Sequence, residues 1–506
     1  MSSTLLGKRD GTRWRTDQRV WIIYAAAVCC TTILVPLFLS PYEYSTVQLV
    51  LASVLACLCL YPTARYFAHP QHDQPAFAVL CISYATQFAV PVFTRDNVID
   101  VVNGVVYLNE QDVVAALVLA ILGVGALQFS YYWFKSSKFS GTIPVVKLPL
   151  NDKRAFVYCI VMTSLLFGVS GLQSLLPSEW AFLLEPLLAF VGLLENQLLV
   201  IIGVLGWLVY SGRGGLAHKT LLYGLVALSV FRGASSAFLE QAILPVVVLF
   251  LMRWLCTRRL PIKSMALAAV AILFLSPVKG NFRAEVWNPS QSIGVGRVER
   301  TFLWFSQASE YWMETLSGER SLVESTAGAA SRTDLIHQLA YIYMTTPSVV
   351  PYEYGGTYSY FVVAWVPRFV WPDKPTAGLA NRNFAVNYGI TTPEVAESTT
   401  FGMSLIGEGF INFGIVGVVL VMAVQGAALS LLEHIFGSYK SGAGGQAVFL
   451  AFYVFLFNGV GSSAEILFGN IFQNLTLSCI LLWWARANPS AVRSAVTGSL
   501  RLSANR

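Results

Sequence analysis

Apolar runs about as long as a bilayer is thick recur along the whole chain. Since a helix needs roughly 20 apolar residues to cross the hydrocarbon core, this pattern predicts an all-α polytopic membrane protein with about 12 transmembrane helices. The expected spans are 20–40, 46–64, 76–94, 112–134, 155–172, 196–211, 219–235, 237–256, 262–278, 408–432, 446–465 and 467–485. The chain then forms a single membrane domain, 1–506, with polar tails at 1–19 and 486–506.

Composition agrees with this reading. Of the 506 residues, 55% are hydrophobic and 12% are charged, whereas a soluble domain carries about 25% charged residues. All eight cysteines lie in or beside apolar runs, so we expect neither a disulfide framework nor a zinc site. Walker A, G-x-G-x-x-G and H-E-x-x-H motifs are lacking as well. The sequence therefore points to no cofactor, no metal site and no nucleic-acid partner.

The distribution of basic residues predicts the orientation. Lys and Arg crowd the first 19 residues, 135–154, 253–263 and the stretch after Trp484, which makes these segments and both termini cytoplasmic. On this topology 11 of the 33 Lys and Arg lie outside, and nine of the 11 fall between Lys279 and Arg382. The exterior region 279–404 is therefore the candidate functional region.

Two parts of this region have a recognisable pattern. Ile336, Leu339 and Tyr343 follow Arg332 at steps of four, three and four, which predicts an amphipathic helix on the membrane or against the bundle, ended by Pro347. Residues 359–371 are too short and interrupted to span. They predict a re-entrant or interfacial hairpin, buried in protein or facing a water-filled cavity.

Cations near the outer headgroup level suggest an anionic ligand. A charge at membrane depth is costly and usually faces a cavity, and guanidinium groups match the oxygens of phosphate. The candidate phosphate-binding residues are Arg368, Arg332, Arg232, Arg283, Lys374 and Arg382. The alternative is a set of snorkelling side chains and surface ion pairs with Glu285, Asp334 and Asp373.

Four motifs in order carry a family resemblance. They are SRTDLIHQLAYIYMTTP (331–347), YGGTYSY (354–360), VPRFVWPDKP (366–375) and GEGFINFGIVG (407–417). Together they resemble the bacterial O-antigen and oligosaccharide repeat-unit polymerases of the Wzy type, by motif over 230–435 and elsewhere by hydropathy and length. The glycines of the last motif are expected to let helices approach closely.

The resemblance implies a glycosyltransferase activity and a cellular location. Such polymerases transfer a glycan from undecaprenyl diphosphate to the nonreducing end of another lipid-linked repeat unit. They act at the periplasmic face of the inner membrane in O-antigen, capsule or exopolysaccharide synthesis. The implied fold is that of membrane-embedded lipid-linked glycosyltransferases. The implied partners are undecaprenyl-diphosphate-linked oligosaccharide, membrane lipid and a chain-length regulator (polysaccharide co-polymerase).

This chemistry assigns roles to further residues. Arginines would stabilise the diphosphate leaving group, and His337, Glu408 or Asp334 would take the proton of the acceptor hydroxyl. Structural alternatives stay open: a His337–Asp334 hydrogen bond on a surface helix, Asp334 holding an Arg, and a buried Glu408 paired with an Arg. Trp365, Trp371 and Tyr358 suit sugar stacking, although an interfacial aromatic belt predicts the same residues.

Two other functions stay open. An O-antigen ligase would move glycan from the same carrier onto a lipid A core, and the cationic residues do not separate it from a polymerase. The order of the motifs favours the polymerase. A transporter or flippase of polyprenyl-linked glycan would line a passage across the bilayer with polar groups, whereas the charges here gather at one face.

The topology makes a direct prediction. A cysteine introduced at Ser325 should react with an impermeant thiol reagent added to intact spheroplasts, because 279–404 is expected outside. A cysteine at Ser136, in an expected cytoplasmic segment, should stay unlabelled. Labelling at Ser136 alone would reverse the topology.

Overall fold

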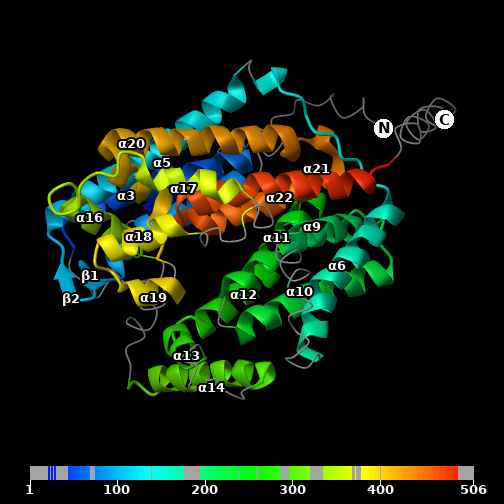
Figure 1. The fold of residues 1–506 in the computed structure, drawn as a ribbon, viewed down its shortest axis with the longest axis horizontal. Helices are drawn as coiled ribbons and strands as arrows, with labels where there is room; N and C mark the ends of the chain where they lie inside the picture. The colour runs from blue at the N-terminus through cyan, green and yellow to red at the C-terminus, as the bar shows by residue number, and fades with distance from the viewer. Residues whose placement is uncertain are drawn as a thin grey trace.

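A computed structural model describes most of the chain. It covers 21–22, 24–26, 28–29, 44–68, 75–137, 140–175, 194–195, 197–236, 239–257, 259, 261–286, 296–319, 334–366, 371, 378–398 and 401–487. Over these residues the protein is mostly helical, with one small β-hairpin (Figure 1).

The elements follow in chain order. The first group is α3 (Thr46–Ala68), α4 (Pro75–Phe88), η2 (Val90–Phe93), β1 (Val98–Val101), β2 (Gly104–Tyr107), α5 (Glu110–Ser136), η3 (Ser140–Thr142) and α6 (Asp152–Leu175). The second is α9 (Gln197–Tyr210), α10 (Leu216–Ser235), α11 (Leu239–Thr257), α12 (Ile262–Leu275), α13 (Lys279–Val286) and α14 (Arg297–Leu316). The third is α16 (Ile336–Thr345), α17 (Gly356–Trp365), α18 (Leu379–Asn387), α19 (Pro393–Ser398), α20 (Ser404–Leu432), η6 (Glu433–Gly437), η7 (Tyr439–Ser441), α21 (Gly442–Asn458), η8 (Gly459–Gly461) and α22 (Ala464–Trp484).

The helices have the length and composition of a membrane protein. Within the described residues, five are long and apolar enough to cross a bilayer: Thr46–Ala68, Pro75–Phe93, Glu110–Ser136, Ser404–Gly437 and Ala464–Trp484. Shorter apolar helices are Gln197–Tyr210, Gln241–Thr257, Ile262–Leu275 and Gly442–Val454. The chain is therefore an all-α membrane protein, and the expected first span lies largely outside the described residues.

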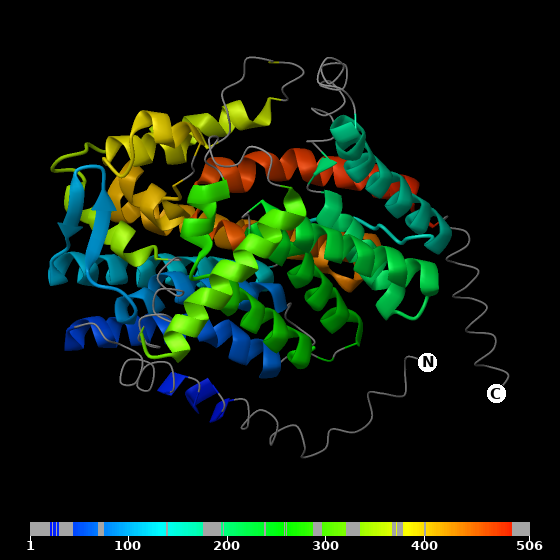
Figure 2. The same cartoon turned by 90° about the horizontal axis from the view of Figure 1, so that it is seen from below.

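Most of the buried apolar side chains form one core. Helices α5 and α20 pack along each other at its centre, and α3, α4, α16, α21 and α9 complete it. A second, small core joins α13 to α14 through Phe282 and Trp304, whose rings stack with centroids 4.9 Å apart. Figures 1 and 2 show α14 as a separate layer, which crosses in front of α10 and α12 in the view from below.

Helix α20 contains a sharp bend. Phe413 and Gly414 leave helical geometry, with φ/ψ of −142°/22° and 61°/−145°, and the second pair of angles is one that glycine adopts readily. A Cβ on Gly417 would lie 2.0 Å from the carbonyl oxygen of Gly409, so the two arms of the helix touch through their backbones. The predicted packing role of these glycines is confirmed.

Asn412 holds this bend in place. Its amide nitrogen donates to Thr357 Oγ1 at 2.7 Å and to the carbonyl of Glu408 at 2.8 Å. Its amide oxygen accepts the backbone N–H of Gly355 at 2.8 Å. A single buried side chain therefore satisfies backbone groups of the bent helix and of the segment that leads into α17.

The hairpin was missed in the sequence. β1 and β2 pair antiparallel, with Val101 opposite Gly104, and the intervening turn is Val102–Asn103. The Asn103–Gly104 dipeptide between apolar residues is a strong hairpin signal. The backbone N–H of Val102 donates to the carbonyl of Gly389 at 2.9 Å, which fixes the hairpin beside the end of α18. We call this the hairpin end of the bundle.

At the opposite end of the bundle, the segment before α6 lies beside the loop before α21 and the end of α22. Leu148 donates its backbone N–H to Ser441 at 2.7 Å, and Asn151 donates to Ala485 at 2.9 Å. The segments expected in the cytoplasm (135–154 and the residues after Trp484) therefore meet here. The hairpin and α16, both expected outside, lie together at the hairpin end, where Leu335 donates to Gln87 at 3.0 Å. Which side of a membrane each end faces stays a prediction.

The structure confirms one expectation for the exterior region and changes another. The predicted amphipathic helix is α16, which begins at Ile336 and ends before Pro347; it packs against α5 and α20, so the bundle alternative is confirmed. The predicted re-entrant hairpin at 359–371 is helical up to Trp365, as α17, which packs on α22. Most of its remainder lies outside the described residues.

The bend predicts a sharp difference between two glycines. Gly417→Ala should destabilise the protein by about 1–3 kcal/mol or more, because the new methyl group overlaps backbone. Gly224→Ala, in α10 with nothing within 4 Å of the added Cβ, should be neutral or mildly stabilising. Thermal unfolding of the detergent-purified variants measures both. Equal melting temperatures would show that the arms of α20 do not touch.

Candidate functional site

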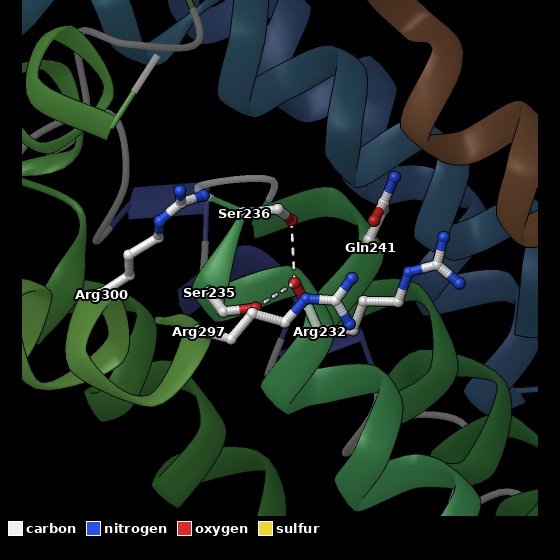
Figure 3. A pocket seen from close by; sticks show the side chains of 6 residues that line it. All are labelled: Arg232, Ser235, Ser236, Gln241, Arg297 and Arg300. Atoms are coloured by element: carbon white, nitrogen blue, oxygen red, sulfur yellow. Dashed lines mark hydrogen bonds between the residues drawn. The ribbon is translucent and has the colours of Figure 1, made fainter. Parts of the chain in front are cut away.

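A cationic pocket lies where α10, α11 and α14 meet. Its volume is about 300 Å³. The described lining residues are Arg232, Ser235, Ser236, Gln241, Arg297 and Arg300 (Figure 3). The guanidinium groups of Arg300, Arg297 and Arg232 are spread across the pocket in that view, and Gln241 lies above the latter two.

Close packing of α10 on α11 positions Arg232. A Cβ on Gly233 would lie 2.5 Å from the backbone nitrogen of Ala242, so only glycine permits this approach. The hydroxyls of Ser235 and Ser236 donate to the carbonyl of Arg232 at 3.0 and 2.8 Å. The same carbonyl also accepts the backbone N–H of Ser236 at 3.2 Å, so the two hydroxyls reinforce the last turn of α10 beside the arginine.

The first turn of α14 supplies the other two arginines. Arg297 and Arg300 are three residues apart, and Trp304 follows four residues later, so all three share one side of the helix. Trp304 is buried against α12 and α13, and its indole N–H donates to the carbonyl of Leu275 at 3.1 Å. Burial of this tryptophan turns Arg297 and Arg300 toward α10.

The pocket favours an anion. Three guanidinium groups line it, and no carboxylate is among the lining side chains that the structure describes. Arg232 has one ion pair at the edge, with Glu195 at 3.4 Å, and both side chains are half-exposed. The N-terminal turns of α11 and α14 also reach the pocket, and helix N-termini carry partial positive charge.

Of the six predicted phosphate-binding cations, the structure places one in the pocket. Arg232 lines the pocket. Arg382 lies half-buried on α18 and is not among the lining residues. Arg283 lies on α13, but its side chain, like the whole of Arg332, Arg368 and Lys374, is outside the described residues. Their expected role as phosphate ligands stays a prediction.

Sequence reasoning missed Arg297 and Arg300. The signal was present, because two arginines three residues apart precede a tryptophan on the same helical face. The stretch 297–316 also shows a helical alternation of apolar and polar residues. What the sequence lacked was the neighbour of this face, since α10 is more than 60 residues away along the chain.

His337 lies in a closed network at the hairpin end. Its Nδ1 is 2.6 Å from Asp334 Oδ2, and its Nε2 is 3.1 Å from the amide oxygen of Asn97. The hydrogen bond to Asp334, the structural alternative, is therefore present. The expected surface position is wrong, because the residue is 1% exposed. Both ring nitrogens have partners, so a base role would require His337 to leave Asn97.

Asp334 links this network to Arg95. Its Oδ1 accepts the backbone N–H of His337 at 3.2 Å, and its Oδ2 lies 3.7 Å from Arg95. Arg95 also pairs with the exposed Asp100 of the hairpin, at 3.1 Å. The suggestion that Asp334 holds an arginine is confirmed, and this arginine was not among the candidates.

Glu408 is fully buried in the first arm of α20. Its carboxylate accepts the backbone N–H of Ala464 at 2.6 Å, at the start of α22. The structural alternative had paired it with an arginine, whereas the group that it holds is a helix N-terminus. Its role as a catalytic base stays a prediction.

The predicted stacking aromatics are spread over two segments. Tyr358 is half-buried on α17, where burial and then the nearby Glu408 carboxylate raise its phenol pKa well above the usual value. Trp371 is exposed, and the side chain of Trp365 is outside the described residues. A further tyrosine in the region, Tyr388 beside α18, is buried against Thr346, and burial raises its pKa to about 12.

No metal-binding cluster is found in the described part of the chain, where no three His, Cys, Asp or Glu side chains come together in a suitable group. The pocket itself offers guanidinium, amide and hydroxyl groups, which suit an anion and not a cation.

Two aspartates around Arg95 give a matched test. Asp334→Ala should destabilise the protein by about 3 kcal/mol, because a side chain only 4% exposed is removed from Arg95 and His337. Asp100→Ala should change stability little, since its side chain is 76% exposed. Thermal unfolding of both purified variants measures the difference. Equal losses would mean that burial of the network adds nothing.

Comparison with known proteins identifies a family whose function is unknown. No curated protein and no solved structure matches the chain significantly. One family model, described as "Domain of unknown function (DUF8712)", matches residues 196–489, more than half of the sequence and including the whole pocket. The chain therefore belongs to the family DUF8712.

Proposed function

We propose that this protein is a membrane-embedded glycosyltransferase that polymerises lipid-linked oligosaccharide repeat units. The observation that carries the proposal is the pocket lined by Arg232, Arg297 and Arg300. The donor in such a reaction is a glycan on undecaprenyl diphosphate. Its diphosphate is the group that three guanidinium side chains at the end of a helical bundle would suit best.

The size and charge of the pocket support this ligand. A volume of about 300 Å³ is at the lower end of small-molecule sites, about 300–1,000 Å³, and would hold a diphosphate but not a polyprenyl chain. The chain would stay in the bilayer. Guanidinium groups fixed in place would also stabilise the charge that develops on the diphosphate as the glycosidic bond breaks.

The acceptor hydroxyl must also lose a proton. The candidates remain His337 with Asp334, and Glu408. Glu408 lies beside Thr357 and Tyr358 and is fully buried, so a base role requires α17 to move. His337 would need to separate from Asn97. Trp365, Trp371 and Tyr358 are proposed to contact sugars, and the polypeptide is proposed to act without a cofactor.

The proposal includes a topology. About 12 transmembrane helices, cytoplasmic termini and a periplasmic region at 279–404 would place the pocket at the outer face of the bacterial inner membrane. The meeting of 135–154 with the residues after Trp484 at one end of the bundle supports this arrangement. A chain-length regulator, the polysaccharide co-polymerase, is a further proposed partner.

An O-antigen ligase is the second candidate, because it uses the same donor and the same cationic pocket suits it. A flippase of polyprenyl-linked glycan is less favoured. The described cationic lining lies at one end of the helices, whereas a transport path requires polar groups through the bilayer.

The test is elongation of lipid-linked repeat units by the purified protein. Arg232→Ala should lower the rate by on the order of 100-fold, the usual effect of removing one donor from a charge-stabilising site. Arg297→Lys should also lower it, because an ammonium cannot contact two phosphate oxygens as a guanidinium does.

Arg213→Ala is the matched control. Arg213 pairs with Asp152 at 3.5 Å, and its side chain is half-exposed, much as Arg232 is with Glu195. It lies outside the pocket and should keep full activity. Transfer only after a lipid A core acceptor is added would indicate a ligase. Absence of transfer with either acceptor, from monodisperse protein, would exclude both enzymes.

A further inference from the structure

We infer that α14 is a membrane-anchoring helix that lies in the headgroup region of the bilayer, with one apolar face in contact with lipid. The inference goes beyond the proposed function and does not depend on it. It rests on three faces of this helix, on its contacts with α12, and on the exposed surface of α12 itself.

The first face of α14 is an exposed apolar stripe. The steps of the helix bring together Val298, Phe302, Phe305, Met313 and Leu316. All five are exposed, Phe302 to 72% and Leu316 to 78%. Only the exposed Ser309 interrupts this stripe, between Phe305 and Met313. An exposed apolar surface of this kind marks a binding face in a protein, and among the described residues the ring of Phe274 contacts it at Phe305.

The second face points into the protein, and the third is polar. Trp304, Ala308 and Thr315 are buried on the side toward α12 and α13. Glu299 and Glu310 are exposed on the remaining side. A helix with separate protein-facing, apolar and acidic faces fits a boundary between protein, lipid and water.

Helix α12 identifies lipid as the partner. It has no buried residue, and its apolar side chains are exposed around the helix: Ile262, Met265, Leu267, Val270 and Leu273. In a membrane protein such a helix is covered by lipid. Its last residues continue into the apolar stripe of α14, because the rings of Phe274 and Phe305 lie 6.0 Å apart.

Two tryptophans of α14 join it to the end of α12. The indole N–H groups of Trp304 and Trp312 donate to the carbonyls of Leu275 and Phe274, at 3.1 and 3.0 Å. These carbonyls belong to the last turn of α12, where helical partners run out. Tryptophan is enriched at the headgroup level of membrane proteins, and Trp312 is only half-buried, whereas Trp304 is buried between the helices. We therefore place the crossing of α14 and α12 at that depth.

An anchored α14 also sets the depth of the cationic pocket. Arg297 and Arg300 lie on its first turn, at the edge of the face that contacts protein. Under the proposed function, this places their guanidinium groups at the level of lipid phosphates. The pocket would then receive a headgroup whose tail never leaves the bilayer.

Nitroxide accessibility tests the anchor without any activity measurement. Labels are attached to Phe302→Cys and Leu316→Cys on the stripe, and to Glu299→Cys and Glu310→Cys as controls on the polar face. Each variant is made in a background that lacks the eight native cysteines and is reconstituted in phosphatidylcholine nanodiscs. Power saturation then compares collisions with oxygen, which enters lipid, and with a water-soluble nickel chelate.

The stripe labels should collide more with oxygen than with nickel, and the control labels should show the reverse. High nickel accessibility at all four positions would place α14 in water and overturn the inference. Low accessibility of the stripe to both reagents would mean that protein covers it, such as a second copy, and would overturn it too. Because the readout is spectroscopic, failure of the glycosyltransferase assay would leave the result intact.

Discussion

Helix ends inside an apolar bundle need polar partners, and two buried carboxylates meet that need. Glu408 accepts the first N–H of α22, and Glu465 accepts the N–H groups of Gly378 and Ala380 at the start of α18, at 2.9 and 3.2 Å. An unpaired backbone group at such a site would cost several kcal/mol. The positions of α18, α20 and α22 relative to one another therefore depend on these contacts.

The sequence predicted features that depend on local pattern. Apolar runs indicated the membrane helices, the glycines of 407–417 indicated close packing, and Pro347 marked the end of α16. Features that depend on distant partners were not predictable. His337 is buried because Asn97 and Asp334 satisfy its ring, and Asn97 is 240 residues away. The hairpin is a different case, because the Asn103–Gly104 dipeptide at its turn was visible in the sequence and was overlooked.

The cationic site contains one residue that the local sequence pattern revealed and two that depend on distant partners. Arg232 was found because a charge stands out near the end of an apolar helix. Arg297 and Arg300 belong to a helix whose mixed composition hides which side faces protein, and only the packing of Trp304 decides it. Arg368 and Arg332 were chosen as further cations expected near the headgroup level, and of the residues between them α16 packs beside the hairpin whereas α17 packs on α22.

The division into two cores has a consequence for cooperativity. Arg232 belongs to a helix of the large bundle, whereas Arg297 and Arg300 belong to the small core, whose buried members are Val278, Phe282, Val286, Trp304 and Ala308. A core of this size confers little local stability of its own. An anion bound by arginines of both cores would add its binding free energy to the stability of the contact between them. Occupancy would thus strengthen the coupling between the two cores, which already touch through Ala234 of α10.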